Sequence, residues 1–328
     1  MAAALLEVEH LRVEIPTRRG VLTAIDDVSF AIGPGEVLGV VGESGAGKSI
    51  TGSAIIGLLE PPSRIAGGRI TFAGRRIDDL SDRAMRPLRG KEIGAIFQDP
   101  LTSLDPLYTV GRQLEETIGT HLALDRAAAR RRALALLQEV GIPAPEQRID
   151  HYPHQFSGGM RQRVVIALAL AGNPRLVIAD EPTTALDVSI QAQIIQLLKR
   201  LTREHDMAVM LVTHDMGVIA ETAHRVAVMY AGRLVELGPV RDVVMRPQHP
   251  YTTGLMGAIP TLGETIERLR QIEGTMPRLA EIPPGCAFHP RCPQVFARCR
   301  VERPELMPAG TAAAACWLHA PVREAARG

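Results

Sequence analysis

The sequence carries almost no net charge. Its 37 Lys and Arg residues are matched by 36 Asp and Glu, which leaves a formal charge of +1 over 328 residues. A chain that binds nucleic acid or an anionic membrane through its overall charge needs a clear basic excess. The totals therefore argue against such partners, and a local basic run such as ARRR at 129–132 is interpreted as a solvated helix face.

Long hydrophobic runs are also missing. The longest apolar run near the middle of the chain, VVIALALAG at 164–172, is about half of the ~20 residues that a membrane-crossing helix needs. The N-terminal stretch MAAALLEVEHL lacks a basic start and reaches Glu7 and Glu9 too early for a secretory signal. We expect a mature cytosolic protein that does not itself span a bilayer.

Cysteine is absent from the first 285 residues, and four cysteines follow within the C-terminal part. Thiols gathered in this way in a cytosolic chain more often bind a metal or a cluster than form disulfides. Their spacing, C-x5-C-x6-C-x16-C, is unlike that of a zinc ribbon and unlike that of a ferredoxin. The candidate ligands are Cys286, Cys292, Cys299 and Cys316.

The surroundings of these cysteines favour an iron–sulfur cluster over other uses. Four soft thiolates are suited to such a cluster, and Arg291, Arg298 and Arg300 offset its negative charge. A mixed zinc site that includes His289 or His319 is an alternative. Plain buried or free thiols are a second alternative.

The apolar patterning predicts two kinds of strand. Alternating segments with glycine-rich turns predict an antiparallel layer from 5–15, 21–32 and 67–77. Short, nearly continuous apolar runs predict parallel strands buried on both faces at 36–41, 175–180 and 207–213. The sequence therefore indicates an α/β core beside an antiparallel layer.

The remaining segments predict additions to this core. The pattern between 105 and 150 is helical and indicates an inserted group of helices, and 225–238 indicates a closing hairpin. From about residue 239 the proline content rises and the periodicity fades, which is typical of a separate C-terminal segment.

The stretch GESGAGKS at 42–49 meets the spacing of a phosphate-binding loop, between a predicted strand and a predicted helix. Its glycines let backbone N–H groups turn toward phosphate oxygens. Lys48 is suited to reach the β- and γ-phosphates, and the Ser49 hydroxyl is suited to ligate Mg²⁺. ATP and GTP both fit this motif, but the chain lacks the N-K-x-D segment expected for reading guanine.

Two acidic residues and a second glycine pair extend the prediction. Asp180 ends a predicted strand, where a carboxylate can hold Mg²⁺, and Glu181 is suited to polarise an attacking water. In FSGGMRQR at 156–163, Ser157 can cap a helix from about Gly159 to Leu170, and Gly158 exposes its backbone N–H. This second phosphate platform has no lysine, which suggests that each platform completes a site with another molecule.

The chain resembles the ATP-binding cassette family on six motifs, which occur in the family's order over about residues 5–240. They are GESGAGKS, Gln98 in IFQDP, FSGGM, LVIADE, Ala185-Leu186-Asp187 in PTTALD, and His214 in LVTHD. The resemblance implies a P-loop NTPase (RecA-like) core with an antiparallel β-subdomain, an inserted helical subdomain at about 100–165 and a C-terminal extension at 241–328.

The resemblance also implies roles for individual residues. Glu181, His214 and Gln98 are the implied catalytic residues, and Mg²⁺ is implied at Ser49, Gln98 and Asp180. In this family two cassettes stack head to tail, so the signature residues serve the partner's nucleotide, and Asp187 communicates across the interface. The signature residues are Ser157, Gly158, Gly159 and Met160. The implied nucleotide-binding residues are Gly42, Glu43, Ser44, Gly45, Ala46, Gly47, Lys48, Ser49, Ile50, Gln98, Asp180, Glu181 and His214.

Two features depart from the usual family pattern. The signature reads FSGGM where LSGGQ is usual, and Ile15 occupies the place where an aromatic ring often stacks on the adenine. Together with DPLTSLDP at 99–106, FSGGM resembles the dipeptide and oligopeptide importer branch and its D-type ATPase subunit. That branch has a similar cysteine-containing extension, which carries a [4Fe–4S] cluster in some members.

The resulting expectation is a peripheral ATPase on the cytoplasmic face of the membrane. Its implied partners are a homologous second ATPase in a heterodimer, two transmembrane permease subunits and an extracytoplasmic peptide-binding protein. An importer of nickel or another small solute is an alternative on the same architecture. A soluble cassette in DNA repair or translation is disfavoured by the single phosphate loop and the short helical insertion. A scaffold with a dead ATPase is disfavoured by the presence of Glu181 and His214.

Overall fold

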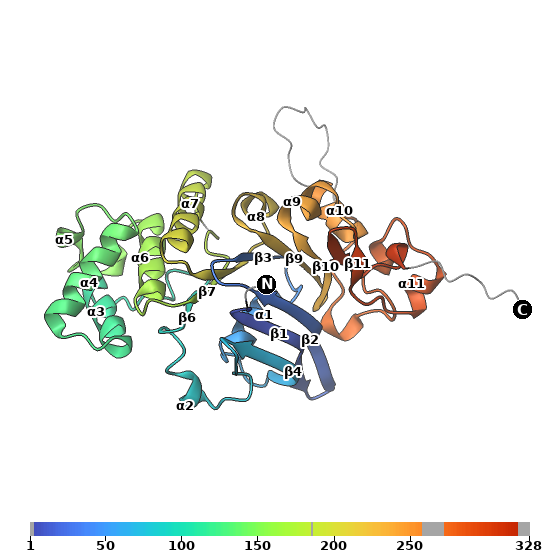
Figure 1. Ribbon diagram of the computed structural model, residues 1–328, viewed down its shortest axis with the longest axis horizontal. Helices are drawn as coiled ribbons and strands as arrows, with labels where there is room; N and C mark the ends of the chain where they lie inside the picture. The colour runs from blue at the N-terminus through green and yellow to red at the C-terminus, as the bar shows by residue number, and fades with distance from the viewer. Residues whose placement is uncertain (1–2, 185, 258–271, 321–328) are drawn as a thin grey trace, which may run out of the picture.

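The computed structural model describes residues 3–184, 186–257 and 272–320, which form two β-sheets with helices around the larger one (Figure 1). The strands are β1 Leu6–Thr17, β2 Gly20–Ile32, β3 Val37–Val41, β4 Arg64–Phe72, β5 Arg75–Arg76, β6 Ile93–Ile96, β7 Leu176–Asp180, β8 Ala208–Val212, β9 Arg225–Tyr230, β10 Arg233–Pro239, β11 Met307–Ala309 and β12 Ala312–Ala314. The helices are α1 Lys48–Ile55, α2 Asp82–Met85, α3 Val110–His121, α4 Arg126–Glu139, α5 Pro145–Arg148, α6 Gly158–Leu170, α7 Val188–Glu204, α8 Met216–Thr222, α9 Val240–Met245, α10 Pro250–Gly257 and α11 Ala297–Val301.

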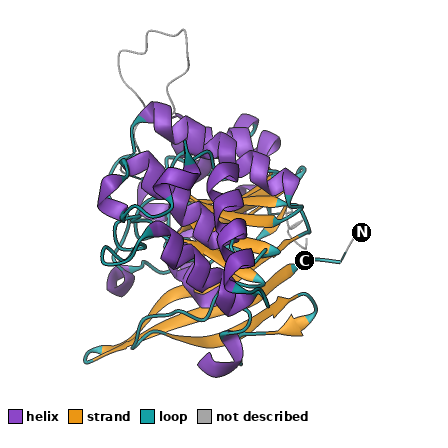
Figure 2. Cartoon of the chain, turned by 90° about the vertical axis from the view of Figure 1, so that its left-hand side faces the viewer, coloured by secondary structure: helices purple, strands orange, loops and turns teal. Residues whose placement is uncertain are grey.

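The smaller sheet is antiparallel, as the alternating segments predicted. Its strand order is β2-β1-β4-β5, and β1 pairs along its length with both β2 and β4. In Figure 2 these strands form a separate layer beneath the helices and the larger sheet. The layer contacts the phosphate loop through β2, because a Cβ on Gly47 would lie 2.6 Å from Cδ1 of Ile25.

The larger sheet holds the parallel strands that the continuous apolar runs predicted. Its order is β11-β12-β10-β9-β3-β8-β7-β6, and the four pairings from β9 through β3, β8 and β7 to β6 are parallel. Every residue of β3 and of β8 is buried. The prediction missed β6, a four-residue strand whose Gly94 packs against the backbone of Ala169 where a Cβ would clash at 2.5 Å.

The side chains of β3 supply two separate hydrophobic cores. Val37 and Val41 face the core formed with the helices, whereas Leu38 and Val40 face the core shared with the antiparallel layer. This alternation follows from the two-residue period of a strand. A strand covered on both faces needs apolar residues at every position, which is why its sequence showed a continuous run rather than an alternating one.

The inserted helices lie at one end of the molecule, where α3, α4 and α5 gather beside α6 (Figure 1). Thr109 and Asp125 cap α3 and α4, and each side chain accepts a hydrogen bond from a backbone N–H of the first turn. Helix α4 ends at Glu139, just before Gly141 with φ of 76°. The predicted helical insertion is therefore present.

The C-terminal segment is built into the larger sheet rather than set apart from it. Strand β12 pairs with β10, with Glu236 opposite Ala314, and β11 pairs with β12. Phe288 from the same segment is buried in the helix-side core. The alanine-rich strand β12 has no alternating pattern, so its pairing with the edge of β10 could not be predicted from the apolar pattern.

Candidate functional site

Four loops meet at the edge of the larger sheet where its parallel strands end. The phosphate loop follows β3, His214 follows β8, Asp180 ends β7 with Glu181 directly after it, and Gln98 follows β6. The order β3-β8-β7-β6 places these loops side by side. Ligands of open α/β sheets bind outside the carboxyl ends of the strands. Residues predicted from separate parts of the sequence are thus brought to one edge.

The phosphate loop wraps around the amine of Lys48. Lys48 is 6% exposed, and its Nζ donates hydrogen bonds to the carbonyl oxygens of Gly42 at 2.8 Å and Glu43 at 3.1 Å. Burial lowers the pKa of this amine, although nearby carboxylates oppose the shift. Gly42 adopts φ of 154°, and a Cβ there would lie 2.3 Å from the carbonyl oxygen of Met229. The loop therefore requires glycine at this position.

Ser49 and Asp180 form the oxygen-rich side of the site. The Ser49 Oγ donates a hydrogen bond to Oδ1 of Asp180 at 3.0 Å. Burial raises the pKa of Asp180, and the charge of Glu181 adds to this shift. Hydroxyl and carboxylate oxygens are the ligands that Mg²⁺ prefers, and a cation here would relieve the repulsion between the two carboxylates. The residues present fit a magnesium ion.

Glu181 is held by contacts from three directions. Its carboxylate accepts a hydrogen bond from Thr184 Oγ1 at 2.7 Å, lies 3.4 Å from Gln98 Nε2, and lies 3.4 Å from His214 Nδ1. Burial favours the neutral form, but the contacts with Thr184 and His214 outweigh it and lower the pKa of Glu181. The carboxylate therefore stays ionised and can accept a proton. The sequence prediction missed Thr184, which stands three residues beyond the acid.

The same edge is open to solvent. The side chain of His214 is 64% exposed, and that of Glu181 is 17% exposed. Ser44, Gly45 and Gln98 are also exposed. The adjacent Ile50 is half-buried and Ala46 is buried. The edge thus forms only one wall of a nucleotide pocket and does not enclose the nucleotide.

The second glycine pair lies at the beginning of α6. Ser157 caps the helix, and its Oγ accepts a hydrogen bond from the backbone N–H of Met160 at 3.4 Å. A Cβ on Gly159 would lie 2.6 Å from Cγ2 of Ile190, whereas one on Gly158 would lie 3.7 Å from Leu186. Within the described ranges no hydrogen bond or ion pair joins these residues to the phosphate loop. The two platforms remain separate within one chain.

Two further predicted residues lie near the start of α7. Asp187 is exposed at the position just before the helix, and its side chain makes no capping hydrogen bond. Ala185 of the same motif lies outside the described residues. In the antiparallel layer, Ile15 pairs with Leu22 near the hairpin turn and is half-buried.

Known proteins with similar sequences share both halves of this chain. Residues 25–184 match the family model described as ABC transporter, and residues 235–299 match the model described as oligopeptide/dipeptide transporter, C-terminal region. The dipeptide transport ATP-binding protein DppD of Bacillus subtilis is 49% identical over 315 residues, which cover 95% of this chain and 94% of the relative. The DppD protein of Escherichia coli is 48% identical over 92% of this chain and 93% of the relative.

The chain belongs to the ABC transporter family. A solved dimeric structure of the ATP-binding cassette MJ0796 with ADP and phosphate matches it with a TM-score of 0.65 and 31% identity, over 72% of this chain and 99% of that one. The ABC ATPase fold predicted from the motifs is therefore confirmed, and the chain is an ATPase of this family. ATP with Mg²⁺ is the expected cofactor pair. In the described part of the cassette, no helix is both long and apolar enough to cross a membrane.

The four cysteines of the C-terminal segment line one small cavity of about 10 Å³. All four are free thiols, and Cys299 and Cys316 are buried. Among the described residues, however, no group of three or more cysteine, histidine or acidic side chains is placed to hold a metal ion. The chemistry of the four thiols fits a cluster, while their present spacing does not. The described side chains thus form no ready metal site, and the iron–sulfur cluster stays a prediction.

Burial raises the pKa values of three of the four thiols. Burial raises the pKa of Cys286 to about 11, with the other three cysteines adding to the effect and a backbone N–H opposing it. Burial also raises the pKa values of Cys292 and Cys316. In the absence of a cation these sulfurs are therefore neutral thiols at physiological pH.

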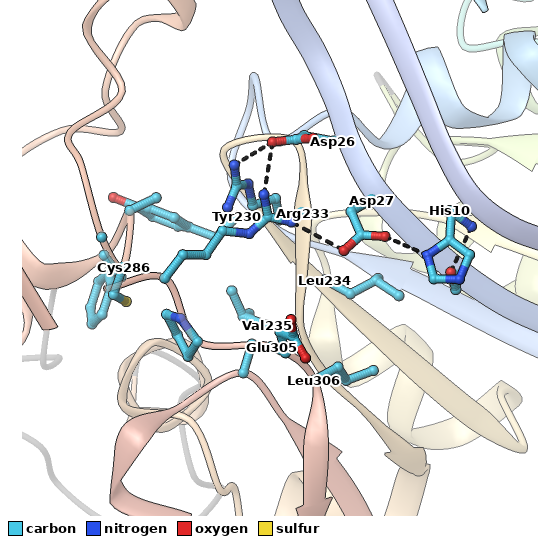
Figure 3. Close-up of a pocket in the computed structure, with 17 residues that line it drawn as sticks. His10, Asp26, Asp27, Tyr230, Arg233, Leu234, Val235, Cys286, Glu305 and Leu306 are labelled. Carbon is cyan, nitrogen blue, oxygen red and sulfur yellow. Dashed lines mark hydrogen bonds and ion pairs between the residues drawn. The ribbon is translucent and has the colours of Figure 1, made fainter. Parts of the chain in front are cut away.

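A larger cavity of about 370 Å³ lies between the antiparallel layer, β10 and the C-terminal segment (Figure 3). Arg233 and Arg303 both pair with Asp26 beside it, and Arg303 also pairs with Asp27 at 3.2 Å. These ion pairs balance the main charges of the cavity wall. None of the predicted nucleotide residues lines this cavity.

Proposed function

We propose that this ABC ATPase drives an importer of di- or oligopeptides. The observation that carries the proposal is the pairing, in one chain, of a cassette with a C-terminal region of the oligopeptide/dipeptide transporter type. The DppD relatives are named as dipeptide transport proteins and match along nearly their whole length. Putative peptide import ATP-binding proteins of Brucella species are similar at 46% identity.

The proposed nucleotide site uses the residues at the edge of the sheet. The N–H groups of residues 42–49 bind the phosphates, with Lys48 on the β- and γ-phosphates. Ser49 and Asp180 hold Mg²⁺, with Gln98 nearby, and the ion neutralises phosphate charge when bound. Glu181 accepts a proton from the attacking water. The oxygen of that water bonds to the γ-phosphorus while the bond between the γ-phosphorus and ADP breaks. His214 contacts the γ-phosphate.

A complete site requires a second cassette in this proposal. The open edge around His214 lacks a second wall, and the signature platform lies at a separate place, with Ser157 exposed and Gly158, Gly159 and Met160 half-buried. Head-to-tail stacking would place the partner's signature platform against the open edge of this chain, and the partner's open edge against this chain's platform. Asp187 would lie at the contact between the two cassettes. ATP binding draws the two cassettes together, and hydrolysis lets them part. We propose that the partner is a homologous but different subunit.

Exposed apolar side chains beside Gln98 support docking to permease subunits. Phe97 is 47% exposed, Leu101 60% and Leu107 78%. Exposed large apolar side chains within one short segment are consistent with an interaction surface. We place the cassette at the cytoplasmic face of the membrane, held there by two permeases, with an extracytoplasmic binding protein delivering the peptide. The proposed division is a nucleotide-binding domain at 1–240, a helical subdomain at about 100–165 and an extension at 241–328.

A [4Fe–4S] cluster on the four cysteines is part of the proposal. The convergence of all four thiols on one cavity supports it, and their side chains would have to shift to surround a cluster. Zinc and metal-free thiols are the competing states. Anaerobic purification followed by iron, sulfide and zinc analysis decides among them. About four irons and four sulfides per chain are expected, and zinc alone or no metal would overturn the cluster.

The transport proposal is tested by reconstituting the chain with its permeases, partner ATPase and binding protein in vesicles. Labelled dipeptides should accumulate only with ATP, and a peptide-loaded binding protein should stimulate hydrolysis. Uptake of Ni²⁺ without any peptide uptake would instead favour the small-solute alternative. ATP hydrolysis by the chain alone at the rate of the full assembly would contradict the shared site.

A further inference from the structure

The C-terminal segment reaches across to the phosphate loop at one residue, Glu43. The backbone N–H of Glu43 donates a hydrogen bond to the Tyr251 hydroxyl at 2.9 Å. The Glu43 carboxylate accepts a hydrogen bond from Arg291 Nη1 at 3.0 Å. Its carbonyl oxygen accepts the bond from Lys48 described above. One residue therefore connects the C-terminal segment to the amine at the centre of the phosphate loop.

Arg291 is fixed in place, unlike the arginine of an ordinary surface ion pair. Its side chain is only 7% exposed. Besides Glu43, its guanidinium donates to the backbone carbonyls of Ile272, Glu273 and Gly274 at 2.9 to 3.3 Å. Because these bonds already restrict the guanidinium, the side chain loses little further conformational entropy when it binds Glu43. The ion pair thus holds the loop firmly.

Tyr251 is equally constrained. It is fully buried, and its ring packs at 4.7 Å from Tyr230 and 5.3 Å from Phe288, centroid to centroid. Phe288 lies three residues before Arg291, so the same part of the C-terminal segment supports both contacts to Glu43. The Tyr251 hydroxyl therefore offers its oxygen to Glu43 from a fixed point.

These contacts bear on nucleotide binding because phosphate affinity depends on how the loop is organised beforehand. A loop already held in its binding conformation loses less entropy when the ligand arrives. The contacts to Glu43 fix its peptide groups and with them the carbonyl that orients Lys48. Removing them would leave the first turn of the loop free to move.

We propose that Arg291 and Tyr251 are positioning residues through which the C-terminal segment sets the ATP affinity of the cassette. The inference rests on the proposed nucleotide site and adds to it a determinant that lies outside the cassette motifs. Neither residue contacts ATP in this proposal. Both act through Glu43.

The test measures ATP binding by the full-length chain with Arg291→Met, which removes the charge but keeps much of the side-chain length. The expected result is about tenfold weaker binding, equivalent to about 1.4 kcal/mol. Arg291→Lys should recover part of the loss, and Tyr251→Phe should weaken binding by a smaller factor. Arg298→Met is the matched control, because Arg298 pairs with Glu302 at 2.7 Å and stacks on Trp317 without reaching the loop.

A double-mutant cycle separates positioning from general loss of structure. In a Glu43→Gln background, Arg291→Met should have little further effect on ATP affinity, because the bond it removes is already weakened. An equal effect in both backgrounds, or wild-type affinity in Arg291→Met, overturns the inference. Thermal unfolding without nucleotide checks that each variant is folded, and Arg291→Lys keeps the test valid if Arg291→Met does not fold. Failure of the wild-type chain to bind ATP would instead reject the proposed function.

Discussion

At the scale of single residues, Glu181 is the group whose removal should separate ATP binding from hydrolysis. Glu181→Gln keeps the size of the side chain but cannot accept a proton, so we expect hydrolysis by the assembled transporter to fall by about 10²–10⁴-fold. ATP binding should remain, and the nucleotide should be trapped between the two cassettes. Phosphate release and retained ATP are the two measurements. Normal turnover at a site that depends on this residue would rule out its role as general base.

Lys48 offers a second residue-scale prediction with a control from the same chain. Lys48→Ala removes the buried amine that the loop surrounds, and ATP binding should weaken by about a hundredfold or more. Lys91→Ala, which removes an exposed lysine, should leave binding unchanged. Titration with a fluorescent ATP analogue measures both. Equal affinities for the two variants would contradict the phosphate-loop assignment.

Most of the catalytic edge could be predicted from the sequence because each motif is contiguous and has its own chemistry. Lys48, Asp180 and Glu181 each stand beside a recognisable strand. Thr184 was missed although its contact with Glu181 is local, because it belongs to no recognised motif of phosphate chemistry. The tether from Arg291 to Glu43 depends on which distant segments fold against the loop, and no local spacing records a contact between residues 43 and 291.

At the scale of elements, the start of α6 distinguishes its two glycines. In Gly159→Ala the new methyl group would meet the branched side chain of Ile190, whereas in Gly158→Ala it finds ordinary contact distance to Leu186. Both changes gain helix propensity to a similar extent. Overpacking of this kind costs about 1–3 kcal/mol, so Gly159→Ala should be less stable than Gly158→Ala by about that amount. Chemical denaturation measures the difference, and equal midpoints would contradict the packing of α6 on α7.

A buried histidine, His249, directly precedes α10, and its charge state should affect the stability of the fold. Complete burial lowers the pKa of His249 to about 3, and its Nδ1 accepts the backbone N–H of Tyr251. Below pH 6.5 the unfolded chain binds a proton that the folded chain does not, so stability falls as the pH falls. The expected loss from this residue is about 2 kcal/mol between pH 7.5 and 5.

His249→Asn retains an acceptor for the Tyr251 N–H but cannot bind that proton. Glu236, which accepts the His249 backbone N–H and whose pKa is raised by burial, remains in the variant and cancels in the comparison. Denaturant unfolding of both proteins at the two pH values should give a smaller loss for the variant, whatever its starting stability. Equal losses would mean that His249 does not stay neutral in the fold.

The secondary structure of the core was predicted more reliably than that of the C-terminal segment, for a physical reason. Strands such as β3 and β8 are buried on both faces and need apolar residues at every position, which leaves a clear record. Strand β12 is three residues long, and its place is set by the free edge of β10 rather than by its own side chains. The place of the short strand β6 is likewise set by its neighbours. Its Gly94 is required because the backbone of α6 approaches too closely for a side chain.

At the scale of the whole molecule, the C-terminal segment should be required for a stable cassette. Truncation after residue 240 uncovers the edge of β10 and removes Phe288 from the core, and the loss of one buried phenylalanine alone costs about 3–5 kcal/mol. We expect aggregation or a strongly lowered melting temperature. Truncation after residue 320 keeps every described strand and helix and serves as the control. A soluble 1–240 fragment that melts with the full chain would contradict this prediction.

The late position of β12 also has a consequence for biosynthesis. Strand β10 ends at Pro239, but the strand that covers its edge begins only at Ala312. A nascent chain leaving the ribosome therefore carries an unpaired edge on β10 until residues 312–314 have been synthesised. Arg291, which braces the nucleotide loop, also emerges late. We therefore expect a product that ends before Arg291 to lack both supports and to form no competent cassette.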